Sequence, residues 1–343
     1  SQKQIRKLVL QALTTLQQGD LLPDLISRSG QPVITDSLVH LHQPFANSDL
    51  NQLSEGLDPA QRALSFEELT AHQTGILFMR EKLVQLPAAQ FQKPSNLVDQ
   101  FIKGLNFTLT QAQLRVAEEI SQDLQKGSPT LRLLQGDVGS GKTVIAALAA
   151  VQASENGFQA ALMVPTEILA EQHYLTLKTW LEPLNITIDW LSGSIKGNTR
   201  SQLLEDLSSG KLQIIVGTHA LFQDQVIFHQ LGLAIIDEQH RFGVHQRMAL
   251  RDKGEKQGFM PHQLIMTATP IPRTLTMSLY GDMDCSIIDE LPAGRTPITT
   301  RIIPGSRRTE IIDRLKQACA SGAQAYWVCT LIESSETLSA EAA

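Results

Sequence analysis

The sequence predicts an α/β protein whose core is a parallel sheet, preceded by a helical segment and followed by the start of a second α/β domain. Short apolar runs alternate with amphipathic segments from about residue 97 onward, which is typical of a parallel sheet covered on both faces. A glycine-rich loop also joins an apolar run to an Ala-rich run within residues 131–151. Strand, glycine loop and helix in this order indicate a phosphate site.

Composition limits the class of protein. The 343 residues, 42% hydrophobic and 19% charged, are those of an ordinary globular chain, with a soft prior of about two domains. There is no run of roughly 18 apolar residues and no apolar region after the N-terminus, so we expect neither a membrane span nor a signal peptide. Three cysteines without C-x-x-C spacing are expected to be reduced thiols of a cytoplasmic protein. A net charge of −6 argues against wholesale nucleic-acid binding but leaves room for a local basic groove.

Residues 1 to about 95 are expected to be helical. An apolar stripe predicts the first helix, and residues 37–42 predict a short second one. The stretch Ser65-Phe-Glu-Glu68 predicts a capping box that opens a longer helix towards Lys82. Residues 85–96 contain two prolines and are expected to be a linker. The stripe comprises Ile5, Leu8, Val9, Leu13 and Leu16.

The sheet is expected to contain the strand before the glycine loop and five others. Helices are predicted at residues 144–151, 167–180 and 199–207. After a turn-rich stretch at 292–297, a strand at 299–303, a helix at 307–320 and a strand at 325–329 begin a second domain. These are too few elements to close a second sheet, so we expect a fragment. The five other strands are Ala160–Val164, Ile186–Leu191, Gln213–Val216, Leu233–Ile236 and Leu264–Thr267.

The glycine loop reads Gly-Asp-Val-Gly-Ser-Gly-Lys-Thr from Gly136 to Thr143. Its glycines allow close approach of the backbone to phosphate, and the N–H groups of the whole loop should surround it. Lys142 should reach the β- and γ-phosphates, and the Thr143 hydroxyl should ligate Mg²⁺. The alternative is a plain turn between strand and helix. The predicted nucleotide-binding residues in the loop are Gly136, Asp137, Val138, Gly139, Ser140, Gly141, Lys142 and Thr143.

Two further polar motifs follow predicted strands. Asp237 can hold Mg²⁺, and Glu238 can orient and deprotonate an attacking water; the alternative is that both only cap the next element. In the stretch from Met266 to Pro270, small hydroxyls can sense the γ-phosphate, and Thr267 or Thr269 can equally cap a helix.

A motif before the loop has two interpretations. The amide of Gln113 can read an adenine edge and Phe107 can cover the base. Thr110 can equally be a plain helix N-cap.

The ordered motifs resemble superfamily 2 helicases. Residues 237–244 followed by Gln246-Arg247, and then Glu290-Leu-Pro-Ala-Gly-Arg295, are similar to the RecG family of ATP-dependent branched-DNA helicases. The resemblance covers nearly the whole chain, most strongly residues 107–333. The motifs are Gly136–Thr143, Pro165-Thr-Glu-Ile-Leu-Ala170, Val216-Gly-Thr-His-Ala-Leu221, Asp237-Glu-Gln-His-Arg-Phe-Gly-Val244 and Met266-Thr-Ala-Thr-Pro-Ile-Pro-Arg-Thr-Leu275.

The resemblance implies a domain plan and a set of partners. Residues 1–95 would link a wedge domain to the motor, 96–291 would form the first RecA-like domain, and 298–343 would begin the second. The chain would use ATP and Mg²⁺ on branched or duplex DNA in recombination and repair, with single-stranded DNA-binding protein as a possible partner. Gln113 would read adenine. Contact with the DNA backbone would fall to Pro165, Thr166, Glu167, Gly217, Thr218 and His219, and coupling of nucleotide state to DNA grip to His240 and Thr267.

The departures from the family are absences. The wedge domain and the later motifs with their arginine finger are missing from these residues, so we expect Mg-ATP binding with poor turnover. A duplex translocase of the transcription–repair coupling type shares several strings, but it is expected to have Glu where this chain has Gln239. A nucleotide switch without motor activity is a third possibility, which the Asp237–Glu238 pair disfavours.

Overall fold

The computed structural model describes residues 2–19, 30, 32–46, 48–238, 258–269, 283–290 and 298–328. The chain divides into two compact units, Ser1–Ala293 and Gly294–Ala343, and each is described by itself.

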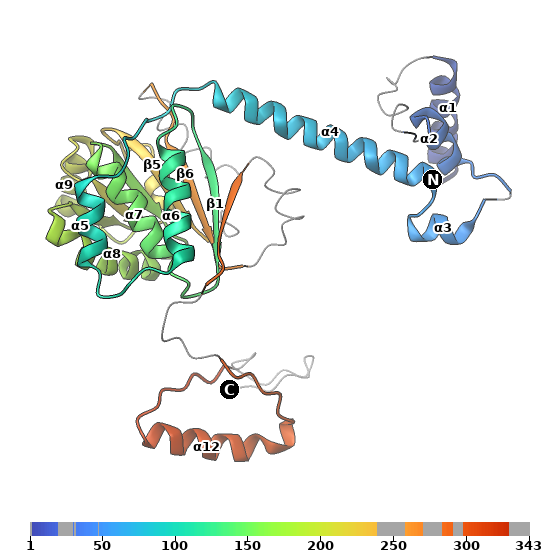
Figure 1. Cartoon of the computed structure of the whole chain (residues 1–343). Helices are drawn as coiled ribbons and strands as arrows, with labels where there is room; N and C mark the ends of the chain where they lie inside the picture. The colour runs from blue at the N-terminus through green and yellow to red at the C-terminus, as the bar shows by residue number, and fades with distance from the viewer. Residues whose placement is uncertain are drawn as a thin grey trace. The chain divides into compact units, whose positions relative to one another are not determined.

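A parallel sheet of seven strands forms the centre of the first unit (Figure 1), in the order β3-β4-β2-β5-β6-β1-β7. All six predicted strands are present, with ends shifted by a few residues. The seventh, β7, was not predicted, because it is an edge strand with alternating exposure and a short apolar run. The strands are β1 Leu131–Gly136, β2 Gln159–Met163, β3 Ile188–Leu191, β4 Ile214–Gly217, β5 Leu231–Asp237, β6 His262–Thr267 and β7 Asp284–Ile288.

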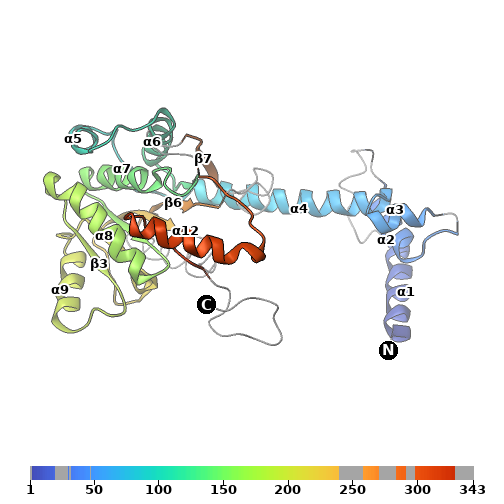
Figure 2. The ribbon, with the colours of Figure 1, turned by 90° about the horizontal axis from the view of Figure 1, so that it is seen from below.

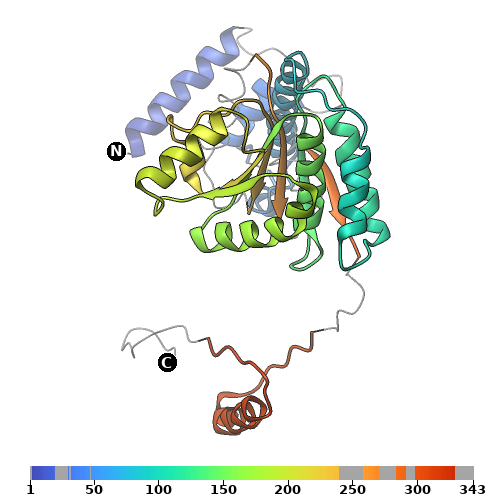
Figure 3. The ribbon, with the colours of Figure 1, turned by 90° about the vertical axis from the view of Figure 1, so that its left-hand side faces the viewer.

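Helices cover both faces of this sheet (Figure 3), as the continuous apolar strands predict. Successive strand residues point to opposite faces: Leu134 and Ile235 belong to one buried cluster, Leu133 and Ile236 to the other. The first cluster includes side chains of α5 (Asn96–Gly104), α6 (Gln111–Leu124), α7 (Lys142–Glu155) and α8 (Glu167–Leu181), and the second those of α9 (Gly197–Ser208). Helix α7 lies beneath α5 and α6 in Figure 2 and is buried from Val144 to Ser154.

The N-terminal residues are helical, as expected: α1 Gln2–Gln18, α2 Ile34–His42, α3 Leu50–Glu55 and α4 Pro59–Val84. The predicted capping box at Ser65 is wrong, because Ser65 lies inside α4. The helix begins earlier, where Asp58 Oδ1 accepts a hydrogen bond from the Ala60 amide at 2.8 Å and Pro59 occupies the first helical position. No helix among the described residues is both long and apolar enough to cross a lipid bilayer.

Residues 85–95 do more than link two elements. The Met260 amide donates to the Pro87 carbonyl at 2.8 Å, and Ala88 forms an isolated parallel bridge with Met260. Ala89 and Phe91 are buried in the core of the sheet. The prolines that suggested a free linker instead mark an extended segment packed against the sheet.

In the second unit, α12 (Arg308–Ala320) confirms the helix predicted there. The predicted strands are wrong for the described residues 299–303 and 325–328, which are irregular. A strand needs a partner for its N–H and C=O groups, and the described part of this unit offers none; accordingly Ile302 is 99% exposed.

Candidate nucleotide-binding site

The polar motifs gather at one edge of the sheet. Because all strand pairs are parallel, their carboxyl ends share that edge, where ligands bind in such sheets. The glycine loop follows β1, Thr166 follows β2, and Thr218 follows β4. Asp237 ends β5 and Thr267 ends β6, the strand between β5 and β1. The motifs that follow these strands therefore lie at one edge of the sheet.

The glycine loop needs its glycines for two reasons. Gly139 and Gly141 have backbone φ angles of +76° and +94°, which residues other than glycine rarely adopt. A Cβ on Gly136 would lie 2.5 Å from Ser140 Oγ. A Cβ on Gly141 would overlap the side-chain Nε2 of Gln113. Backbone and neighbouring side chains thus approach one another more closely here than any larger residue permits.

The ammonium group of Lys142 folds back over the loop. Its Nζ donates to the carbonyl oxygens of Gly136 at 2.7 Å and Asp137 at 3.0 Å. Burial lowers the pKa of Lys142, and the carboxylates of Asp237, Glu238 and Asp137 oppose that shift. A phosphate arriving in the loop would replace two neutral acceptors with charged ones, which form stronger hydrogen bonds with an ammonium group.

The loop contains a buried hydroxyl group. Ser140 Oγ is buried and has no hydrogen-bond partner within the described residues, although such groups are usually satisfied. Gly141, the N-cap of α7, leaves the first amides of that helix directed into the same loop. The arrangement fits a phosphate group.

Mg²⁺ also fits the donor set. Thr143 is the last residue of the glycine loop and Asp237 ends β5, which is separated from β1 by β6, and both side chains present the oxygen ligands that Mg²⁺ prefers. The described residues contain no cluster of three or more His, Cys, Asp or Glu side chains arranged for a metal. A site shared with nucleotide phosphates is consistent with both facts, because Mg²⁺ keeps few protein ligands.

Gln113 is only 2% exposed, and both ends of its side-chain amide are hydrogen-bonded. Its Oε1 accepts from the Thr110 amide at 2.9 Å, and its Nε2 donates to the Ser140 carbonyl at 2.8 Å. Thr110 accepts in turn from the Gln113 amide, which completes a capping box on α6. The N-cap interpretation of Thr110 is confirmed, and adenine recognition by Gln113 stays a prediction.

Phe107 is partly exposed and packs edge-on against Trp180, with ring centroids 6.2 Å apart. Trp180 also meets Phe101 at 6.1 Å. The Phe107 ring is therefore held against Trp180 of α8. The role of Phe107 in covering a base stays a prediction.

The acidic pair lies at the end of β5, beside the end of β6. Glu238 has φ of +55°, which is unusual for a residue with a side chain. Its amide donates to the Met266 carbonyl at 3.0 Å, and its Oε1 accepts from the Ala268 amide at 3.4 Å. Backbone strain of this kind concentrates at functional sites.

Asp237 has a partner that sequence reasoning missed. The imidazole of His173, on α8, donates from Nε2 to Asp237 Oδ2 at 3.2 Å. Both side chains are largely buried, 13% and 15% exposed. No local signal marks His173, because the contact depends on how α8 packs beside the sheet.

The predicted DNA-contact residues divide into exposed and buried ones. Thr166 caps α8 through a 3.3 Å hydrogen bond from the Leu169 amide, and Glu167 accepts from the Gly193 amide at 3.0 Å. Both are exposed, as is His219. Thr218 is buried and its hydroxyl lacks a hydrogen-bond partner among the described residues. Gly217 is crowded, since a Cβ there would meet the Leu191 carbonyl at 2.7 Å.

Several remaining site residues have simpler positions. Pro165 is half-buried between β2 and α8. Thr267 is buried, and its Oγ1 accepts from the Thr269 amide at 3.1 Å, as a local cap does. The predicted coupling residue His240 lies outside the described residues.

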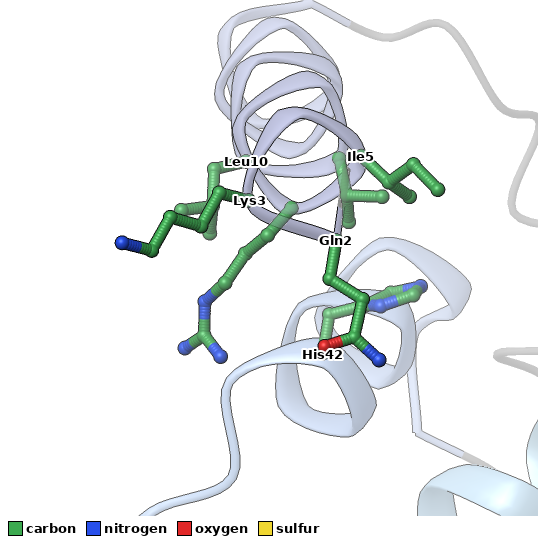
Figure 4. Close-up of a pocket in the computed structure, with 7 residues that line it drawn as sticks. Gln2, Lys3, Ile5, Leu10 and His42 are labelled. Carbon is green, nitrogen blue, oxygen red and sulfur yellow. The ribbon is translucent and has the colours of Figure 1, made fainter.

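A separate pocket lies between α1 and α2 (Figure 4). Its lining mixes cationic and apolar side chains and includes no predicted site residue and no carboxylate. The lining residues are Gln2, Lys3, Ile5, Arg6, Val9, Leu10 and His42.

Comparison with known proteins gives one consistent result. The family model described as DEAD/DEAH box helicase matches residues 110–278. The chain is 52% identical to the ATP-dependent DNA helicase RecG of Haemophilus influenzae and 53% identical to that of Escherichia coli O157:H7, over 100% of this chain and 50% of each relative. A structure of RecG bound to a three-way DNA junction is similar, with a TM-score of 0.75 and 35% identity over 94% of this chain and 43% of that one. The chain spans 50% of the length of these two curated relatives.

Proposed function

We propose that this chain, which belongs to the RecG family, is the ATP-binding half of a motor that remodels branched DNA. One observation supports the proposal most strongly. The glycine loop follows β1 and the Asp237–Glu238 pair ends β5, so Lys142 and both carboxylates lie at one edge of the sheet, where the two carboxylates oppose the lowering of the Lys142 pKa by burial. A lysine suited to phosphate and an acidic pair at one edge of the sheet support a site of the kind that nucleotide hydrolysis requires.

Each residue has a role in that chemistry. Lys142 and the loop amides would bind the phosphates, and Thr143 and Asp237 would hold Mg²⁺. Bound Mg²⁺ would neutralise charge that develops on the phosphates. Glu238 would orient the attacking water and accept its proton. Gln113 would hold the loop and read the base.

We propose DNA as the partner on two grounds, which are the similarity to RecG proteins and the exposed residues where helices follow the strands. Thr166, Glu167 and His219 lie at the same sheet edge as the glycine loop, where hydroxyl and backbone groups suit phosphate contacts without sequence information. Stalled forks and Holliday junctions would be the substrates, single-stranded DNA-binding protein a further partner, and the cytoplasm the location. The transcription–repair coupling alternative is not favoured, because the similarity to RecG proteins extends over nearly the whole of this chain.

The test is ATPase activity of the full-length protein on a forked DNA and on linear duplex of equal length. Strong preference for the fork supports a branched-DNA remodeller, and Glu238→Gln should then abolish turnover while nucleotide still binds. Equal stimulation by both DNAs would favour a duplex translocase. Absence of stimulation by either would leave a nucleotide switch and remove the DNA assignments.

A further inference from the structure

We propose that His173 is a positioning residue, which orients the Asp237 carboxylate for Mg²⁺ and links that carboxylate to the DNA-facing end of α8. The proposal rests on the proposed function, because it assigns a task within the same site.

The hydrogen bond itself restricts Asp237. His173 Nε2 donates to Oδ2 at 3.2 Å, which leaves Oδ1 for a metal ion or its water. The pair is 13% and 15% exposed, and a hydrogen bond screened from water is electrostatically stronger than an exposed one. Groups that orient a metal ligand in this way typically contribute about 10–100-fold to metal affinity.

The position of His173 on α8 adds a second consequence. The same helix begins at Glu167, with Thr166 as its N-cap, so the predicted DNA contacts lie about 9 Å along the helix axis from His173. A displacement of α8 by bound DNA would change the donor that holds Asp237. By reciprocity, a metal ion that fixes Asp237 would favour one position of α8.

The alternative is that the pair only stabilises packing. Three substitutions separate the two roles. His173→Gln keeps an N–H donor near the position of Nε2, whereas His173→Asn has an amide too short to reach Asp237 and His173→Ala has none. Gln172→Ala, at an exposed position of the same helix, is the control.

The readout is the affinity of this chain for a fluorescent ADP analogue, measured with Mg²⁺ and with EDTA. We expect His173→Ala and His173→Asn to weaken the Mg²⁺-dependent part of the affinity by about tenfold, to leave affinity in EDTA unchanged, and to be rescued by His173→Gln. Equal losses in Mg²⁺ and EDTA, or no loss in either, would overturn the proposal.

A second measurement needs no ligand. Ring ¹⁵N–¹H spectra of the metal-free chain should show the proton of His173 on Nε2, and this signal should shift in Asp237→Asn but not in Gln172→Ala. A His173 ring protonated only on Nδ1 would contradict the assigned contact. If the wild-type chain bound no nucleotide while the ring signal was as expected, the proposed function would fail and the contact would stand.

Discussion

The side-chain amide of Gln113 donates a hydrogen bond to the main-chain carbonyl of Ser140 at 2.8 Å. The same side chain accepts from the Thr110 amide, so one buried amide joins the first turn of α6 to the glycine loop. Any ligand that competes for this amide also releases the loop carbonyl. If Gln113 reads a base as proposed, base recognition and the shape of the glycine loop are connected through a single side chain.

Gln113→Glu should separate the two functions of this amide. The carboxylate still accepts from Thr110 but cannot donate to Ser140, and leaving that buried carbonyl unsatisfied should cost about 1–3 kcal/mol of unfolding free energy. Urea unfolding measures the loss, and nucleotide affinity should fall with it. Gln122→Ala, exposed on the same helix, should change neither; comparable stability of Gln113→Glu and wild type would refute the link.

Glu238→Gly should be more stable than Glu238→Ala. Both variants lose the carboxylate, but only glycine adopts a φ of +55° without strain, and the difference should be about 1–2 kcal/mol in urea unfolding. Ser209, which has φ of −85°, is the matched control, because there the alanine variant should be the more stable one. If alanine were the better residue at position 238 as well, the backbone strain described for this site would be absent in solution.

His262 should make the stability of the chain depend on pH. Its ring is buried, with Nε2 donating to the Ala89 carbonyl at 2.6 Å and Nδ1 accepting from the Thr130 hydroxyl at 2.8 Å. Burial lowers the pKa of His262 from 6.5 to about 4. Between these values the unfolded chain binds a proton that the folded chain does not. The contribution of neutral His262 to the free energy of unfolding is therefore present in full above pH 6.5 and is lost as the pH falls towards 4.

The size of that loss follows from the shift in pKa. A difference of one in pKa corresponds to about 1.4 kcal/mol, so the total loss in the free energy of unfolding is about 3 kcal/mol. Urea unfolding of wild type and His262→Phe at a series of pH values isolates it, because the variant lacks the titrating group. His229→Phe, at an exposed histidine, should keep the wild-type pH dependence; a His262→Phe curve parallel to wild type would exclude His262 as the cause.

Lys142→Met should abolish nucleotide binding without lowering the stability of the chain. Burial disfavours the charged form of Lys142, and among the described residues its Nζ donates to the carbonyl oxygens of Gly136 and Asp137, so removing the charge removes an unfavourable group. Titration with a fluorescent nucleotide and thermal unfolding measure the two effects. Lys211→Met, on the exposed surface, should leave both unchanged, and a destabilised Lys142→Met chain would show that the lysine has a structural role.

The elements predicted from sequence and those missed differ in physical origin. Strands such as Leu231–Asp237 are buried on nearly every residue, and burial on both faces produces the continuous apolar run that was recognised. Strand β7 is half-exposed, so its pattern is weak. The false capping box at Ser65 had the right local chemistry, but the Asp58–Pro59 start signal lies upstream and continues the helix through it.

In the candidate site, contiguous motifs were likewise predicted from the sequence, whereas contacts between distant residues were missed. The glycine loop and the Asp237–Glu238 pair are contiguous in sequence, so their residue types alone indicate their chemistry. The hydrogen bond between His173 and Asp237 joins residues 64 positions apart, and the Gln113–Ser140 bond depends on how α6 packs against α7 and β7. Such contacts arise from tertiary packing, which local patterns do not encode.

The position of β1 in the sheet has a consequence for synthesis on the ribosome. This strand pairs with β6 and β7, so the neighbours of the strand that precedes the glycine loop begin only at His262. A nascent chain that ends before that residue contains every residue of the loop without the strands that flank it. Domains generally fold as units during translation, and non-local pairing is slow. A nucleotide that binds this loop should therefore be unable to act as a folding ligand until translation has passed β7.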